Sequence, residues 1–130
     1  MTFARLFLIA AGLFLVVLGV AYLFWPVQLA ALSELALATP AAIIEVQGFY
    51  GGQMLGLGAF VLLGAFRERW QAAALLLVAL DIGGTAAGRV TGILAGGSAP
   101  DVILGLLALE TATAVVAVLL LRRHCTDCKA

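Results

Sequence analysis

The sequence predicts an all-α protein, built as a bundle of four transmembrane helices. Two observations lead to this fold class. The 130-residue chain is 65% hydrophobic and 11% charged, with a mean hydropathy of +1.19, whereas soluble domains are about half apolar and about a quarter charged. Its apolar residues also fall into four stretches, each near the roughly 20 residues that span a bilayer. We expect one transmembrane domain over residues 1–121 and a short cytoplasmic tail at residues 122–130.

The predicted spans cover residues 3–25, 42–66, 70–94 and 102–121. The first has a long apolar core and no small-residue cleavage site after it, which favours a retained helix over a signal peptide. Between the first two spans, Pro26 and Pro40 bracket a segment with an amphipathic pattern. That pattern predicts a short helix in the membrane interface, and a plain apolar loop is the alternative.

Basic residues predict how the bundle is oriented. In a four-span chain the basic residues at the helix ends, in the loops and in the tail all fall on one side: Arg5, Arg67, Arg69, Arg122, Arg123 and Lys129. The other side carries only the acidic Glu34 and Asp101. Short loops rich in Lys and Arg stay in the cytoplasm. Both termini are therefore expected inside, in a multi-pass protein of a bacterial cytoplasmic (inner) membrane.

Glycines recur four residues apart in the two central spans, at Gly48, Gly52 and Gly56 and again at Gly84, Gly88 and Gly92. Small residues at this spacing share a helix face and let backbones approach closely in lipid. We expect the two spans to cross on these faces, although homodimer seams would use the same pattern. Gly12 and Gly19 offer a weaker seam in the first span. The Tyr-Gly-Gly at residues 50–52 also suggests a helix break that exposes backbone groups to a ligand.

Polar residues within the spans define a candidate ligand-binding or proton-relay site: Glu45, Tyr50, Gln53, Asp81, Arg89 and Glu110. Ionisable residues are costly in a bilayer, so they usually face the bundle interior and mark function. Depth along each helix predicts an outer pair of Glu45 with Arg89. Asp81 and Glu110 are expected deeper, near Gln53. The alternative role for these residues is to hold the helices together.

No strong catalytic or metal motif occurs in the sequence. His124, Cys125 and Cys128 supply three candidate ligands, whereas a structural zinc site needs four, so this is a weak metal candidate and a reduced, solvated tail is the simpler interpretation. No cofactor is expected, and an enzyme is the least favoured class. The net charge is zero, which argues against a nucleic-acid partner.

Three segments resemble a known family: EVQGFYGGQMLGLG at residues 45–58, GRVTGILAGGSAPD at 88–101 and LGLLALETATAV at 104–115. They are similar to small bacterial four-helix membrane proteins grouped as domain-of-unknown-function family 4345. The resemblance covers most of the chain. It implies a four-helix bundle and places emphasis on a set of motif residues: Glu45, Gly48, Tyr50, Gly51, Gly52, Arg89 and Glu110. Asp81 has no counterpart in the pattern, and the resemblance implies no activity.

The favoured hypothesis is a membrane protein that binds or transports a small molecule, ion or lipid at a polar site between the helices. An accessory subunit of a larger membrane complex is the alternative, with the charges holding the bundle together. An intramembrane enzyme is the third. The lipid bilayer is an expected partner in each case. Further partners would be other copies of the chain in a homo-oligomer, or the subunits of a larger membrane complex.

Overall fold

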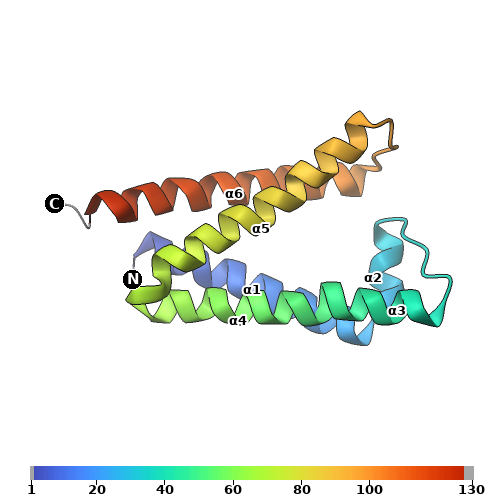
Figure 1. The fold of residues 1–130 in the computed structure, drawn as a ribbon, viewed down its shortest axis with the longest axis horizontal. Helices are drawn as coiled ribbons and strands as arrows, with labels where there is room; N and C mark the ends of the chain where they lie inside the picture. The colour runs from blue at the N-terminus through green and yellow to red at the C-terminus, as the bar shows by residue number, and fades with distance from the viewer. Residues whose placement is uncertain (1, 128–130) are drawn as a thin grey trace.

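A computed structural model describes residues 2–127, and every regular element in this range is helical (Figure 1). In chain order the elements are α1 (Phe3–Phe24), α2 (Pro26–Leu32), α3 (Pro40–Val46), the π-helix η1 (Gln47–Gly52), α4 (Gln53–Phe66), α5 (Glu68–Leu94) and α6 (Asp101–Asp127). Four helical segments are long and apolar enough to cross a membrane: Phe3–Phe24, Pro40–Phe66, Glu68–Leu94 and Asp101–His124. The prediction of an all-α chain with four such helices is confirmed.

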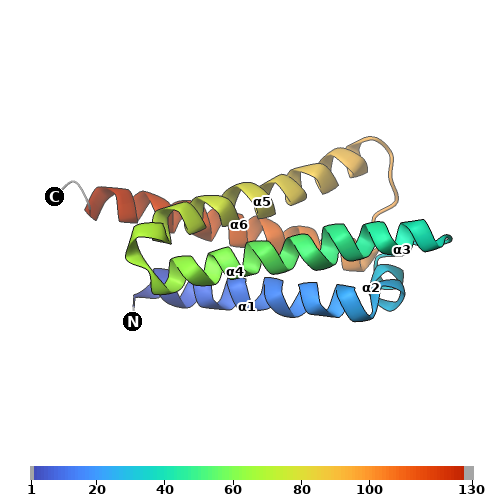
Figure 2. The same ribbon diagram turned by 60° about the horizontal axis from the view of Figure 1, so that its bottom comes forward.

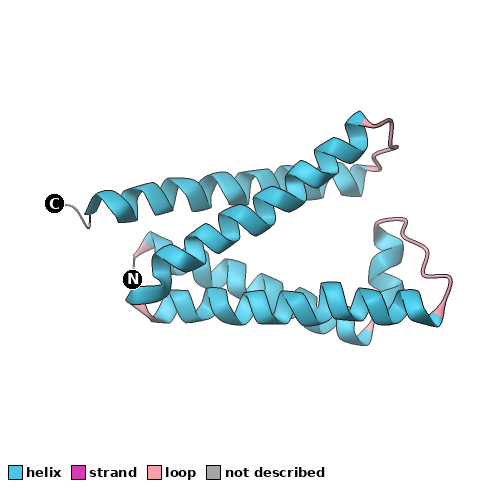
Figure 3. Cartoon of the chain, viewed as in Figure 1, coloured by secondary structure: helices cyan, strands magenta, loops and turns pink. Residues whose placement is uncertain are grey.

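Local signals explain where the spans begin and end. The second span starts at Pro40, two residues before the expected position, because Thr39 is its N-cap and accepts a hydrogen bond from the Ala42 amide at 3.2 Å. α5 ends where Gly96 adopts a φ of +92°. The Gly97 amide then donates to the Gly92 carbonyl at 3.1 Å, which satisfies the helix end. Short loops join most of the helices (Figure 3).

α6 extends beyond its expected end at residue 121 and stays helical through Asp127. Arginine is a good helix former, so Arg122 and Arg123 continue the helix rather than stop it. Most of the segment expected as a tail is thus a continuation of α6. Cys128 lies outside the described residues.

The four spans form two helical hairpins that meet at one end and diverge at the other. α1 runs alongside η1 and α4, whereas α5 crosses α6, and α5 moves away from α4 with distance from their turn (Figures 1 and 2). Buried side chains from all four spans fill the end where the hairpins meet: Leu8, Leu15, Val61, Ala65, Ala74, Leu75, Val78, Ala117 and Leu120. We call this end the packed end and the other the open end.

Glycines bring α1 and α4 into backbone contact. A Cβ added at Gly58 would lie 2.9 Å from the Gly12 carbonyl oxygen, and one added at Gly19 would lie 2.9 Å from that of Gly51. These distances leave no room for a side chain. The seam that the sequence indicated only weakly is therefore a contact between helix backbones, which α1 makes with η1 and α4.

The predicted crossing of the two central spans on glycine faces is wrong for this structure. A Cβ would meet nothing within 4 Å at Gly48, Gly56, Gly84, Gly88 or Gly92, and at Gly52 it would meet only a carbonyl of its own turn, at 3.9 Å. The cause is that α4 packs along α1, so α5 contacts α4 only near their turn, where Gly64 fits against Ala74.

The second span widens into a π-helix at Tyr-Gly-Gly instead of breaking. η1 covers Gln47–Gly52 and continues into α4 without interruption. π-helical turns are rare and frequently occur at functional sites. The Gln47 side chain donates from Nε2 to the Leu23 carbonyl at 2.9 Å. η1 is thereby tied to the last turn of α1.

Polar contacts at the packed end join the start of the chain to the α4–α5 turn. Arg5 Nη2 lies 2.5 Å from Glu68 Oε1, so the beginning of α1 and that turn lie together. The C-terminal part of α6 reaches the same end (Figure 1). At the open end, α2 supplies the short helix expected after the first span, over residues 26–32.

The α1–α4 seam predicts opposite effects for two neighbouring glycines. Gly58→Ala should destabilise the protein by about 1–3 kcal/mol, because the new methyl group meets backbone atoms of α1. Gly56→Ala, in the same helix, should be neutral or stabilising by up to about 1 kcal/mol, because it gains helix propensity in open space. Thermal unfolding in mild detergent measures both. Equal effects would contradict the seam.

Candidate functional site

α4 and α5 diverge away from their turn (Figure 1), and the sides on which they face each other carry exposed residues such as Gln53 and Thr85, so we call the open space between them the cleft. Ala74 of α5 faces α4 at the packed end, since it meets Gly64 there. Asp81, Thr85 and Gly92 follow at 7, 11 and 18 residues along the helix, within about 20° of the same face at 100° per residue. These residues therefore point toward α4 across a gap that widens with distance from the turn.

Gln53 lies on the opposite wall of this cleft. It precedes Gly64 by 11 residues, so it shares the side of α4 that faces α5. Gln53 and Asp81 are each 13 residues from the ends of α4 and α5 that flank the turn. The two polar side chains are thus at equal depth, as the sequence indicated for Gln53.

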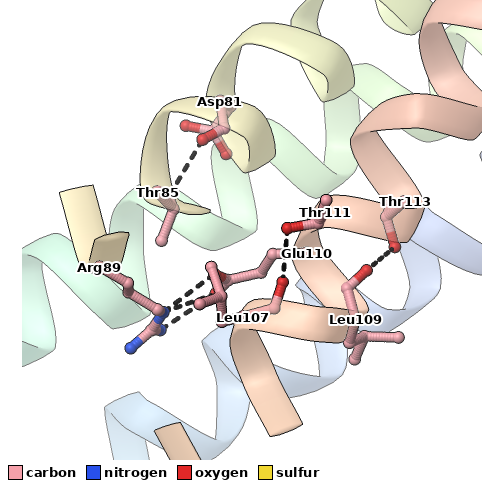
Figure 4. Close-up of polar contacts among 8 residues, drawn as sticks. All are labelled: Asp81, Thr85, Arg89, Leu107, Leu109, Glu110, Thr111 and Thr113. Atoms are coloured by element: carbon pink, nitrogen blue, oxygen red, sulfur yellow. Dashed lines mark hydrogen bonds and ion pairs between the residues drawn. The ribbon is translucent and has the colours of Figure 1, made fainter. Parts of the chain in front are cut away.

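Arg89 and Glu110 form an ion pair that links α5 to α6 near the open end (Figure 4). Arg89 Nε donates to Glu110 Oε2 at 2.9 Å and to Oε1 at 3.1 Å, and Nη2 donates to Oε1 at 3.0 Å. The side chains are 25% and 13% exposed. Such a two-pronged pair is stronger and more directional than a single charge contact.

The expected Glu45–Arg89 pair is wrong, because Arg89 pairs with Glu110. Depth was a poor guide here: α3 belongs to the hairpin of α1, whereas Arg89 points to the neighbouring α6. Glu45 instead lines an open groove of about 370 Å³ along the second span, with Ile44, Gly48, Phe49 and Gln53. Its carboxylate has no hydrogen bond within the described chain.

The deeper acidic group of Asp81 and Glu110 does not form either. Glu110 is engaged by Arg89, and the Asp81 side chain points away from that pair (Figure 4). The Thr85 hydroxyl donates to the Asp81 main-chain carbonyl at 3.0 Å, so it does not bind the carboxylate. The hydroxyls of Thr111 and Thr113 likewise donate to main-chain carbonyls of their own helix, at Leu107 and Leu109. Asp81 is left as a half-buried carboxyl group in the cleft wall, without a hydrogen bond to a described residue.

Tyr50 contacts a tyrosine that the sequence reasoning missed. The rings of Tyr22 in α1 and Tyr50 in η1 are 5.1 Å apart between centroids, at an interplanar angle of 33°. The sequence does place both tyrosines near the expected outer ends of their spans, so their proximity could have been predicted. Tyr22 was overlooked because it is uncharged, and the sequence reasoning followed charged residues.

A second open groove, of about 400 Å³, lies at the mouth of the cleft. Its walls are Ser33, Glu34, Arg89, Gly92, Ile93, Gly97, Ser98, Pro100 and Ile103. Glu34 has a φ of +58°, which is unfavourable for a residue with a Cβ by roughly 1–2 kcal/mol. The Leu35 amide donates to the Ala30 carbonyl at 3.0 Å, so the end of α2 holds Glu34 in this conformation. Strained residues of this kind cluster at ligand sites.

The weak metal candidate is not assembled by the part of the chain that the structure describes. No group of three or more His, Cys, Asp or Glu side chains converges there. Cys128 is outside the described residues, so the predicted set of His124, Cys125 and Cys128 is not placed.

The fold defines a class: an all-helical protein with four helices that are long and apolar enough to cross a membrane, arranged as two hairpins. The chain belongs to the DUF4345 family, a domain of unknown function, whose sequence profile matches residues 3–121. The resemblance noted from its motifs is therefore confirmed. Neither curated proteins nor solved structures give a significant match.

A double-mutant cycle should show coupling across the ion pair. Arg89→Gln and Glu110→Gln should each cost about 1–3 kcal/mol, because each leaves a partly buried charge unpaired. The double variant should lose less than the sum, since no unpaired charge remains. Unfolding free energies in detergent give the coupling. Additive losses would mean that the two side chains do not interact in the membrane protein.

Proposed function

We propose that the chain is an integral protein of a bacterial cytoplasmic membrane that binds a small membrane-soluble molecule in the cleft between α4 and α5. The observation that carries this proposal is the position of Arg89. Its Nε and Nη2 engage Glu110, and Arg89 is also one of the residues that line the open groove at the cleft mouth. An arginine has five N–H donors, so donors remain for a ligand.

The proposed ligand would enter from the side. The cleft lies within the spans, where the surrounding solvent is lipid, so a membrane-soluble molecule reaches it without crossing water. Ionisable residues in such a position usually serve a ligand, an ion or a proton path. Asp81 and Gln53 would offer further polar contacts deeper in the cleft.

Binding is favoured over transport by a single chain. The core at the packed end is filled by side chains of all four spans, so the cleft ends against close-packed apolar atoms. A molecule that passed from one side to the other would have to separate that core. A transport path would therefore need a homo-oligomer or a large rearrangement of the hairpins.

An accessory subunit is the second candidate, and the open glycines favour it. Gly48, Gly56, Gly84 and Gly88 have no neighbour within 4 Å of an added Cβ, although small residues in lipid commonly serve helix contacts. Another membrane protein, or a second copy of this chain, would cover these faces. In that case the charges of the cleft would stabilise the assembly.

Native mass spectrometry of the protein in nanodiscs separates the two candidates. We expect a discrete bound molecule on the wild-type chain, lost in Arg89→Gln because the guanidinium donors are removed. The matched control is Arg67→Gln, an arginine at the α4–α5 turn, outside the cleft. The control should keep the ligand.

Two results would contradict the binding proposal. One is an apo mass in every preparation, and the other is equal ligand loss in both arginine variants. A stoichiometric protein partner that Gly52→Leu removes, with no small molecule bound, would favour the accessory subunit.

The cytoplasmic location of both termini is supported by the arginines near the packed end. Arg5 and Glu68 pair there, beside Arg67 and Arg69, and the positive-inside rule applies to short loops. In a variant without native cysteines, Ser33→Cys and Ser98→Cys should react with a membrane-impermeant thiol reagent added to intact cells. Glu68→Cys should react only after lysis. The reverse pattern would invert the orientation.

A further inference from the structure

The charges around the groove at the mouth of the cleft, which Arg89 and Glu34 line, limit the chemical class of the ligand. The positive charge of Arg89 is already matched by Glu110 in the two-pronged pair. Glu34 lines the same groove and adds a negative charge. Glu110 is not a lining residue, but as the partner of Arg89 it lies beside the groove, so the site has two carboxylates and one basic group. Asp81 lies about two turns deeper. An anionic headgroup placed there would be repelled.

The guanidinium nevertheless needs hydrogen-bond acceptors. Three of its N–H bonds, two on Nη1 and one on Nη2, have no acceptor among the described residues, since every hydrogen bond of Arg89 goes to Glu110 from Nε and one Nη2 proton. In Figure 4 a guanidinium nitrogen points away from Glu110. Donors without acceptors are costly in an apolar setting. A neutral oxygen acceptor would satisfy them without adding to the negative charge.

The shape of the site also suits a lipid rather than a small ion. The groove of about 400 Å³ is open on one side, and its α5 wall includes Gly92, which has no side chain. Apolar side chains also line it, at Ile93 and Ile103. A hydrocarbon chain could leave the groove laterally into the bilayer while a polar head stays beside Arg89.

We propose that the ligand is a neutral lipid that carries a carbonyl group. A carbonyl oxygen of its head accepts from the remaining N–H donors of Arg89, and the carboxylates of Glu34 and Glu110 exclude anionic headgroups. This inference rests on the proposed function, because it assigns the ligand class to the same cleft.

Two lipids with identical acyl chains test the role of head charge. Dioleoylglycerol is neutral and has two ester carbonyls, whereas dioleoylphosphatidylglycerol adds an anionic phosphate. Both are added in equal amounts to phosphatidylcholine nanodiscs that contain the full chain. Native mass spectrometry then gives the ratio of the two bound species. We expect the wild type to retain the diacylglycerol at least tenfold over the phosphatidylglycerol.

Removing a carboxylate from the groove should shift this ratio. Glu110→Gln and Glu34→Gln should each move it toward phosphatidylglycerol by about tenfold, because each raises the charge of the groove by one unit. Glu34→Gln leaves the ion pair intact, so it also covers the case in which Glu110→Gln folds poorly. Glu68→Gln is the matched control: it also removes the acidic partner of an arginine, but at the packed end, and should leave the ratio unchanged.

The outcomes separate the two proposals. A wild type that prefers phosphatidylglycerol, or a ratio that neither groove variant moves while Arg89→Gln still abolishes binding, overturns the neutral-lipid class and leaves the cleft as a binding site. Binding of neither lipid, or binding that Arg89→Gln does not affect, overturns both.

Discussion

Backbone contact between α1 and α4 is the interaction on which the rest of the structure depends. Inside a bilayer the hydrophobic effect does not drive helices together, so close packing has to do so. Gly12, Gly19, Gly51 and Gly58 remove the side chains that would keep α1 and α4 apart. Many weak dispersion contacts then add along the seam. Because α4 packs along α1, α5 packs against α6 instead. The two hairpins therefore diverge, and the cleft lies between them.

The Arg89–Glu110 pair stabilises the second hairpin and shapes the cleft at the same time. Its opposite charges offset part of the cost that either would have alone in the membrane. The pair draws Glu110 away from Asp81 and Arg89 away from Glu45. Two carboxylates are thereby left without a hydrogen bond in the described chain, in positions where water, lipid or a partner would have to meet them. Packing within the described chain does not explain these residues.

Sequence reasoning selected Arg89, Glu110, Asp81 and Gln53 as candidate site residues, because a charged or polar side chain inside a span is a strong signal. The first three are half-buried, whereas Gln53 is exposed. Sequence reasoning chose the wrong partners. Position along a helix predicts depth, but pairing also needs to know which helices are neighbours and how each is rotated. Tyr22 and Glu34 were missed for related reasons. Tyr22 looks like an ordinary interfacial aromatic, and Glu34 lines a groove with Arg89 only because the segment after α2 lies beside the α5–α6 loop.

The number and length of the spans, and the family of the chain, were determined by the sequence itself. Insertion of a helix in lipid depends on the hydropathy and length of one segment, and both can be counted locally. Only the tertiary structure decided which glycines pack, which carboxylate binds Arg89, and where the cleft opens. Several faces of the spans have similar glycine spacing. Which of these faces pack together depends on the packing energy summed over whole helix pairs, and the spacing of glycines does not give that energy.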